Sequence, residues 1–335
     1  MSDVGAPHRI IPWDQPLLAD LKKEIDPFGG GDYFRPLDRA YNGDTTFWSV
    51  PSPEPHLSDD FWDAVRDELD QPAIRAAAVA LAEAISSWEP DGGKLVFAAI
   101  LRAGVPVADW LRNLLPGSVA VALSLFVGIG VDRMAVHHLR ARFPDRKLVF
   151  VDGWTGRGGV AREIAQSGEG PLAVLIDPWG WADFSGCRED RFCPSACFTG
   201  PATLGFSRTF FVESGRLFAA YRFPRRYRRD DLVRTWRSLR PAPDDPAGNE
   251  PAGADGPARF YRDTVMRIHA NEVCRALINA APETIYFRGG PVHVRERYGL
   301  ILALAEHRGP AVRYDARFLA ELRTEVACTF AGPSA

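Results

Sequence analysis

The chain has 335 residues, of which 46% are hydrophobic and 25% are charged, a composition typical of a well-packed globular protein. Its formal net charge of -3 gives no overall argument for a nucleic acid or an anionic membrane as partner. No apolar run approaches the roughly 18–20 residues of a membrane-spanning helix, and the N-terminus does not read as a secretory signal. Five cysteines, an odd number, favour reduced thiols. We therefore expect a cytoplasmic protein.

Composition divides the chain into four parts. Residues 1–60 are rich in Pro, Gly, Asp and aromatic side chains, which predicts an irregular N-terminal arm packed on the core. A helical region follows Ser58, a suitable N-cap for the acidic turn behind it. Residues 61–239 form the predicted main domain. Residues 240–259 are dense in Pro, Gly and acidic side chains and predict a linker, and residues 260–335 predict a small α/β domain.

The main domain alternates apolar strands with helical segments. Lys94–Ile100 and Lys147–Asp152 are two of four such strands. This alternation predicts an α/β fold, a parallel sheet flanked by helices on both faces. Ligands of such sheets bind beyond the carboxyl ends of the strands. The segments LRAG (101–104), DGWTGRGG (152–159) and DPWG (177–180) follow such ends, so we expect the site at this edge.

The stretch VFVDGWTGRGGV places a glycine-rich turn between a strand and a helix. Backbone N–H groups and the positive end of the helix would form an anion cradle. Thr155 would add a hydroxyl group and Arg157 a charge, while Asp152 could accept hydrogen bonds from vicinal ribose hydroxyls. The turn has neither the Gly-Lys-Ser/Thr ending of a P-loop nor the G-x-G-x-x-G spacing. A plain β–α turn with convenient glycines is the alternative interpretation.

These motifs resemble those of a known fold. The strand, acid and short turn resemble the phosphoribosyl pyrophosphate loop of type I phosphoribosyltransferases, although Asp152 stands alone where two adjacent acids are usual. The LRAG segment looks like the pyrophosphate-binding turn of uracil phosphoribosyltransferases. There Arg102 would offer a donor fork, and Ala103 and Gly104 would let the backbone come close.

The glycine turn and a second, cysteine-rich segment together resemble the phosphoribosyltransferase-like family of tellurium-resistance and stress gene clusters. The second segment is GCREDRFCPSACFTGPATLGFSRT (186–209). Some members of that family carry the label cysteine protease StiP. The resemblance covers roughly Phe28 to Ser238, and the C-terminal part is more weakly similar to a pelota-like, RNA-binding-type domain. It implies a type I phosphoribosyltransferase fold followed by a small α/β domain.

The resemblance also implies an activity. A pentosyltransferase of this kind would move ribose 5-phosphate from phosphoribosyl pyrophosphate to a small-molecule acceptor, with Mg²⁺ carried largely by substrate oxygens. Asp152, Arg102 and Asp177 would be the catalytic residues. Homodimerisation and RNA contact through the C-terminal domain are lesser expectations, and no membrane partner is expected. The expected substrate-binding residues are Ala103, Gly104, Gly153, Thr155, Gly156, Arg157, Gly158, Gly159, Arg188, Ser195 and Arg208.

Two other functions stay open. The missing second acid favours a non-catalytic nucleotide- or phosphoribosyl-binding protein with RNA contact. A cysteine hydrolase would need a base beside its thiol, and His137 and His138 are the candidate bases for Cys187, Cys193 and Cys197. The spacing of these cysteines does not match the C-x-x-C pairs of zinc sites, and buried apolar thiols are the structural alternative. Asp177 could equally be a helix N-cap, and the basic run 222–231 a solvated face.

Overall fold

The computed structural model describes residues 8–29, 32–34, 50–239, 241 and 266–330. Its centre is a seven-stranded sheet in the order β1-β2-β5-β4-β8-β9-β10, parallel from β2 to β10 with β1 antiparallel at the edge. The mostly parallel α/β sheet expected from the sequence is thereby confirmed. The strands are β1 (His8–Ile10), β2 (Gln15–Leu17), β4 (Leu95–Ile100), β5 (Val119–Leu123), β8 (Lys147–Trp154), β9 (Leu172–Ile176) and β10 (Phe184–Cys187).

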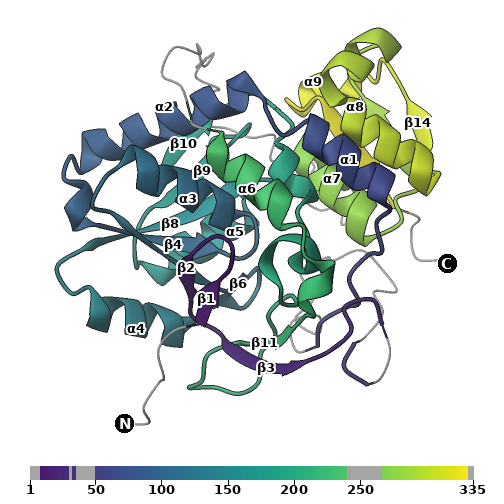
Figure 1. The fold of residues 1–335 in the computed structure, drawn as a ribbon. Helices are drawn as coiled ribbons and strands as arrows, with labels where there is room; N and C mark the ends of the chain where they lie inside the picture. The colour runs from purple at the N-terminus through teal and green to yellow at the C-terminus, as the bar shows by residue number, and fades with distance from the viewer. Residues whose placement is uncertain (1–7, 30–31, 35–49, 240, 242–265, 331–335) are drawn as a thin grey trace.

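Helices cover both faces of this sheet (Figure 1). Side chains alternate between the faces, as they must in a strand: in β4, Phe97 and Ala99 join one apolar cluster, while Val96 and Ala98 join the other. The first cluster includes α2 (Pro72–Trp88) and α3 (Gly104–Leu114), and the second includes α4 (Arg133–Arg142) and α5 (Gly159–Ser167). Burial on both faces explains why these strands are continuous apolar runs.

The helix boundaries follow local capping signals. Ser58 accepts a hydrogen bond from the Phe61 N–H and caps α1 (Asp59–Asp67), as predicted. Asp132 caps α4 by accepting from the N–H groups of Met134 and Ala135. The remaining elements of the main region are β3 (Asp20–Glu24), which pairs with β11 (Ala219–Arg222), the short pair β6 (Leu125–Phe126) and β7 (Gly130–Val131), and α6 (Asp230–Ser238).

The expected N-terminal arm contains more regular structure than its composition suggests, because β1 and β2 extend the central sheet. The expected linker lies outside the described residues except for residue 241. No helix within the described ranges is long and apolar enough to cross a membrane.

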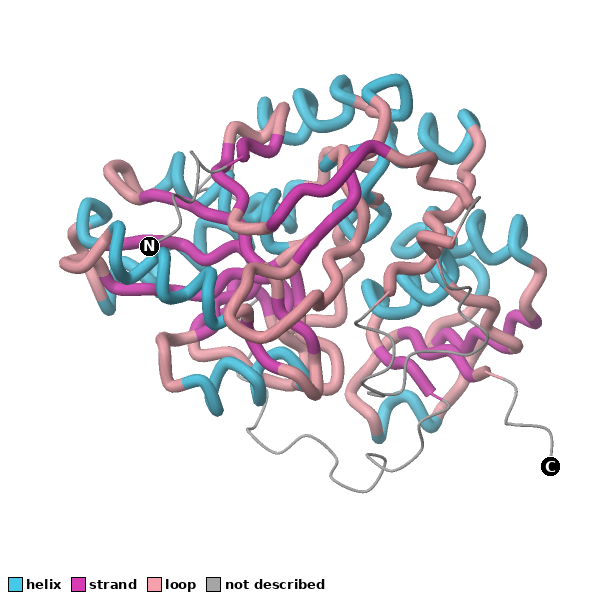
Figure 2. Tube along the Cα trace, turned by 90° about the horizontal axis from the view of Figure 1, so that it is seen from below, coloured by secondary structure: helices cyan, strands magenta, loops and turns pink. Residues whose placement is uncertain are grey.

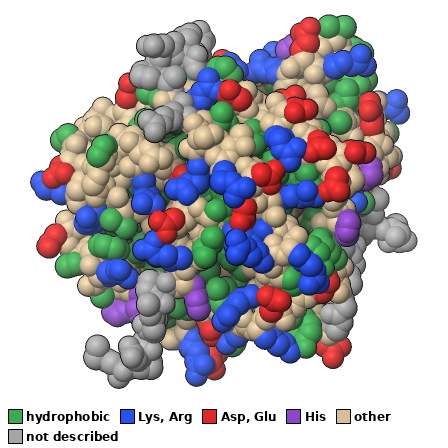
Figure 3. Space-filling view, in the orientation of Figure 1, with side chains coloured by type: hydrophobic (Ala, Val, Ile, Leu, Met, Phe, Trp, Pro, Cys, Tyr) green, Lys and Arg blue, Asp and Glu red, His purple; other side chains and the backbone are tan. Residues whose placement is uncertain are grey.

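Lys and Arg side chains gather across the middle of the face in Figure 3, with acidic side chains among them. In the basic run, Arg228 pairs with Asp230 at 2.9 Å, and Arg229 pairs with Asp59.

The C-terminal part is a second α/β layer beside the main sheet (Figure 2). Its four-stranded sheet has the order β12-β15-β13-β14, and α7 packs on β12 and β15 and against α8. Its elements are β12 (Met266–Ile268), α7 (Ala270–Asn279), β13 (Thr284–Phe287), α8 (Pro291–Arg308), β14 (Ala311–Arg313), α9 (Phe318–Glu321) and β15 (Val326–Thr329). The start of α7 is tied to the main region, because Asp190 Oδ1 accepts the Ala270 N–H at 2.8 Å and Asn271 Oδ1 accepts the Cys193 N–H at 2.8 Å.

Candidate functional site

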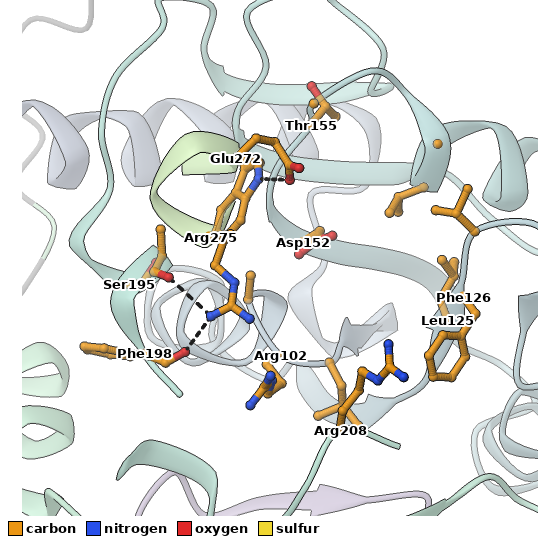
Figure 4. Close-up of a pocket in the computed structure, with 18 of the residues that line it drawn as sticks. Arg102, Leu125, Phe126, Asp152, Thr155, Ser195, Phe198, Arg208, Glu272 and Arg275 are labelled. Carbon is orange, nitrogen blue, oxygen red and sulfur yellow. Dashed lines mark hydrogen bonds between the residues drawn. The ribbon is translucent and has the colours of Figure 1, made fainter. Parts of the chain in front are cut away.

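A cavity of about 570 Å³ opens at the carboxyl ends of β4 and β8 (Figure 4). Its walls come from the 101–103 turn, the glycine turn with the start of α5, the 195–209 loop, β12 and α7. The edge of the sheet predicted from the sequence is therefore one wall of the cavity, and α7 of the C-terminal part is another. Six arginines and two carboxylates line the cavity: Arg102, Arg157, Arg162, Arg208, Arg267 and Arg275, with Asp152 and Glu272.

Asp152 lies near the end of β8 and faces the centre of the cavity (Figure 4). Its pKa is raised to about 7, mainly by burial and to a lesser extent by the nearby Glu272 carboxylate, while a hydrogen bond from the Gly153 N–H at 2.7 Å partly offsets the rise. A carboxyl group that titrates near neutral pH can both donate and accept a proton under working conditions. From the sequence Asp152 was expected only to accept hydrogen bonds, and its raised pKa was not predicted.

The glycine turn has an open helix end. Gly158, the N-cap of α5, has φ +74° and offers no side-chain cap, so the first N–H groups of α5 keep their capacity for an anion. Packing also demands glycine here. An added Cβ at Gly158 would lie 2.6 Å from the Trp181 ring, and one at Gly156 would lie 2.9 Å from Glu272 Cγ. The packing explains these two glycines, and the anion cradle stays a prediction.

Thr155 and Asp177 form a structural pair. The Thr155 hydroxyl donates to Asp177 Oδ1, and the Asp177 carboxylate also accepts the N–H groups of Trp181 at 3.0 Å and Ala182 at 2.8 Å. Asp177 is fully buried and does not line the cavity. Among the described residues no helix follows Asp177 before β10, so it is not the helix N-cap given as the alternative; it holds the 178–182 turn and is kept from touching a ligand in the cavity.

Three further predicted residues lie outside the cavity lining. An added Cβ at Gly104 would lie 2.0 Å from the Val151 carbonyl oxygen, so this glycine lets α3 approach β8. Gly153 packs against Ala103, where an added Cβ would lie 3.0 Å from the Ala103 Cβ. Arg188 lies over Gly180. The predicted residues that the structure brings together are Arg102, Ala103, Asp152, Thr155, Gly156, Arg157, Gly158, Gly159, Ser195 and Arg208.

The predicted arginines have protein partners. Arg102 Nη1 donates to both carboxylate oxygens of Glu54, at 2.8 and 2.9 Å, and both side chains are largely buried. Arg208 donates to the Val50 carbonyl at 3.3 Å and lies over the Phe126 ring. Arg102 and Arg208 lie near each other in Figure 4. Glu54, which holds the Arg102 guanidinium in place, was not predicted from the sequence.

Sequence reasoning missed two residues of α7, Glu272 and Arg275. Glu272 accepts hydrogen bonds from Trp154 Nε1 and Arg267 Nη1, each at 2.8 Å. Arg275 Nη1 donates to the carbonyl oxygen of Phe198 at 3.3 Å, and burial together with the nearby Arg102 charge lowers its pKa to about 10. These residues follow the glycine turn by more than a hundred positions, and no motif marks them.

The cysteines show no activated thiol. All five are buried, and burial raises the pKa of Cys193 to about 11 and that of Cys197 well above its usual value. His137 and His138, the expected bases, belong to α4 on the opposite face of the sheet. No thiol has a hydrogen bond to an imidazole among the described residues.

A resident metal site is also not evident in the described part of the chain, which has no group of three or more His, Cys, Asp and Glu side chains placed to hold an ion. Asp152 and Glu272 are the cavity's own carboxylates. Magnesium stays a prediction from the resemblance.

Comparisons with known proteins bear on these expectations. The family model described as "Tellurite-like stress resistance cysteine protease StiP" matches residues 41–236. A relative named cysteine protease StiP, from Acinetobacter baylyi, is 32% identical over 114 residues. This match spans 30% of the present chain and 30% of the relative's length. No solved structure gives a significant match, so a type I phosphoribosyltransferase fold is not shown.

The expected phosphoribosyltransferase function was wrong. The matched family and the relative are both named as cysteine proteases, which contradicts the pentosyltransferase activity and the transferase assignment made from the loop resemblance. The resemblance to the StiP-labelled family itself is confirmed. The family model spans more than half of the 335 residues, and the chain therefore belongs to the StiP family of tellurite-like stress resistance proteins.

Proposed function

We propose that the cavity binds a small anionic substrate and that Asp152 is the acid–base group acting on it. The observation that carries this proposal is the position of Asp152, a carboxyl group with a pKa of about 7, in a cavity lined by six arginines. Perturbed titrating groups in a cleft are typical of functional sites. A volume of about 570 Å³ suits a small molecule.

Charge argues for an anion. Glu54 offsets Arg102, and Glu272 offsets Arg267, yet the remaining lining is basic. The open N-terminus of α5 adds a partial positive charge at the same wall. A protonated Asp152 would not repel an anion, whereas an ionised Asp152 would. The substrate should therefore bind best below the pKa of Asp152.

Isothermal titration tests this proposal. Sulfate and oxalate, which keep their charge across the range, are titrated into the full chain from pH 5.5 to pH 8.5. We expect the affinity of a binding anion to fall as the pH rises through 7 in the wild type, and to fall less in Asp152→Asn. Absence of anion binding at every pH would refute the proposal, and an equal fall in both proteins would remove Asp152 from it.

A cysteine hydrolase is the second candidate, and the names of the family and the relative favour it. One contact supports it: Ser195 lines the cavity, and its Oγ lies 3.1 Å from Cys193 Sγ, so this thiol lies directly behind the wall. His269 precedes the Asn271 that accepts the Cys193 N–H, and its Nδ1 lies 3.7 Å from Asp190. In such chemistry the Cys193 thiol would lose its proton to a base and attack a carbonyl carbon. The tetrahedral intermediate would collapse to a thioester as the C–N bond breaks and the amine leaves with the proton, and water would then hydrolyse the thioester and return the thiol.

Peptide and ester hydrolysis by the full chain tests this second candidate. Cys193→Ala is compared with Cys328→Ala, which removes a buried thiol from β15 in the C-terminal sheet. Hydrolysis that is lost only in Cys193→Ala would support the thiol enzyme. Hydrolysis that survives in Cys193→Ala would exclude Cys193 as its nucleophile.

A further inference from the structure

Arg275 is a cavity residue supplied by the C-terminal part, outside the segment that the family model matches. In Figure 4 its guanidinium group extends from α7 toward Arg102 and the side of the cavity that holds Asp152. Its Nη1 donates to the carbonyl oxygens of Phe198 at 3.3 Å and Ala196 at 3.5 Å. Among the described residues, no carboxylate lies within ion-pair distance of Arg275.

The charge around Arg275 is incompletely balanced. Glu54 is engaged by Arg102, and Glu272 is engaged by Arg267 and Trp154. Removing a cation from water without a counter-ion costs free energy. The depressed pKa of Arg275 reflects this burial and the neighbouring Arg102 charge. An anion placed between Arg102 and Arg275 would supply the missing negative charge.

The position of Arg275 is fixed before any ligand arrives. The two hydrogen bonds at the start of α7 hold the helix against the main region. One helical turn further on, Cys274 Sγ lies 3.5 Å from Cys197 Sγ, and Glu272 reaches the Trp154 indole. A guanidinium group on a docked helix loses little freedom on binding, which favours affinity.

We propose that Arg275 anchors the substrate of this cavity and that the substrate presents a tetrahedral oxyanion, of the phosphate ester class, between Arg275 and Arg102. This inference rests on the proposed function. The choice of anion follows from the donors. Arg102 and Arg275 come from different elements, the 101–103 turn and α7, and each carries several N–H donors, so a group with several oxygens can accept from both at once. A monocarboxylate has two oxygens and one plane.

The test uses the full chain with inorganic phosphate, sulfate, malonate and acetate as calorimetric probes. Arg275→Gln removes the charge, and Arg275→Lys keeps the charge but removes the planar guanidinium with its paired N–H donors. Arg313→Gln, which changes an exposed arginine on β14, is the matched control. We expect Arg275→Gln to weaken phosphate binding by about ten-fold or more, as for loss of a charge-assisted hydrogen bond. Arg275→Lys should recover part of the affinity, and Arg313→Gln should bind like the wild type.

The ligand-free melting temperature separates binding from folding. We expect it to be unchanged or higher in Arg275→Gln, because a partly buried cation is removed, while phosphate raises it less than in the wild type. Wild-type affinity for phosphate in Arg275→Gln would overturn the anchoring role and leave the anion-binding role of the cavity intact. Tighter binding of malonate than of phosphate would overturn the oxyanion class. Failure of the wild type to bind any of the four anions would overturn both this inference and the proposed function.

Discussion

Asp152→Asn should stabilise the fold at alkaline pH, because the wild-type carboxyl has a pKa of about 7 in place of its ordinary 3.8. Between these two values the folded state holds more protons than the unfolded state, so the free energy of unfolding falls as the pH rises. The loss begins near pH 4 and is complete above pH 7. The full shift corresponds to about 4 kcal/mol, an upper limit because water in the cavity can reach the carboxyl.

Urea unfolding measures the effect over the range where the chain is easily handled. From pH 5.5 to pH 8, we expect the stability gain of Asp152→Asn over the wild type to grow by about 2 kcal/mol. Asp145→Asn, at an exposed position before β8, is the matched control and should show no such growth. If the gain of Asp152→Asn stays constant with pH, the pKa of Asp152 is not raised. The carboxyl would then be ionised at neutral pH and could not donate a proton there.

Three further predictions concern stability and thiol access. Asp190→Asn should lower the free energy of unfolding by about 3 kcal/mol at pH 7. The reason is that the buried carboxylate accepts from Thr324 Oγ1 and from two backbone N–H groups of the C-terminal part. Burial opposes ionisation of Asp190, but the His269 imidazole and these donors hold its pKa below the usual value, so the cost in urea unfolding should shrink as the pH falls below about 4. Gly104→Ala should lower the free energy of unfolding by about 2 kcal/mol or more through its clash with β8. Gly299→Ala, which has open space in α8, should raise it by up to about 1 kcal/mol in the same assay. The five buried thiols should react slowly with a colorimetric disulfide reagent until the chain is unfolded, and one fast native thiol would favour the hydrolase candidate.

Local patterns determined what could be predicted of the fold. The run Leu95–Ile100 is buried at every position, as a strand covered on both faces must be, and its composition alone shows this. Ser58 caps its helix through a contact that spans three residues. The glycine turn, Asp152 and Arg102 reach one cavity because the carboxyl ends of parallel strands meet at one edge. Each of these features depends on neighbours in sequence or on a general rule of topology.

The parts of the site that escaped prediction depend on tertiary contacts. Glu54 neutralises Arg102 from 48 residues away, and Arg275 enters the cavity only because α7 docks against the 190–199 loop. Asp177 was placed at the correct edge, but the direction of its side chain follows from two hydrogen bonds within its own turn and one from Thr155, 22 residues away, that the sequence did not reveal. The transferase assignment failed for a related reason: it rested on the likeness of individual loops, whereas activity depends on the whole set of groups around a cavity.

The two candidate functions make opposite demands on one loop. Arg275 is held by the carbonyl oxygens of Ala196 and Phe198, so an anion site built on Arg275 requires the 195–198 segment to stay closed. A hydrolase using Cys193 requires the same segment to open, because the thiol lies behind Ser195 and burial keeps its pKa near 11. Both chemistries cannot occur in one state of the loop. Binding of a phosphate-type anion should therefore protect the Cys193 thiol from alkylation if the closed state is the working one, and a substrate that instead speeds alkylation would favour the thiol enzyme.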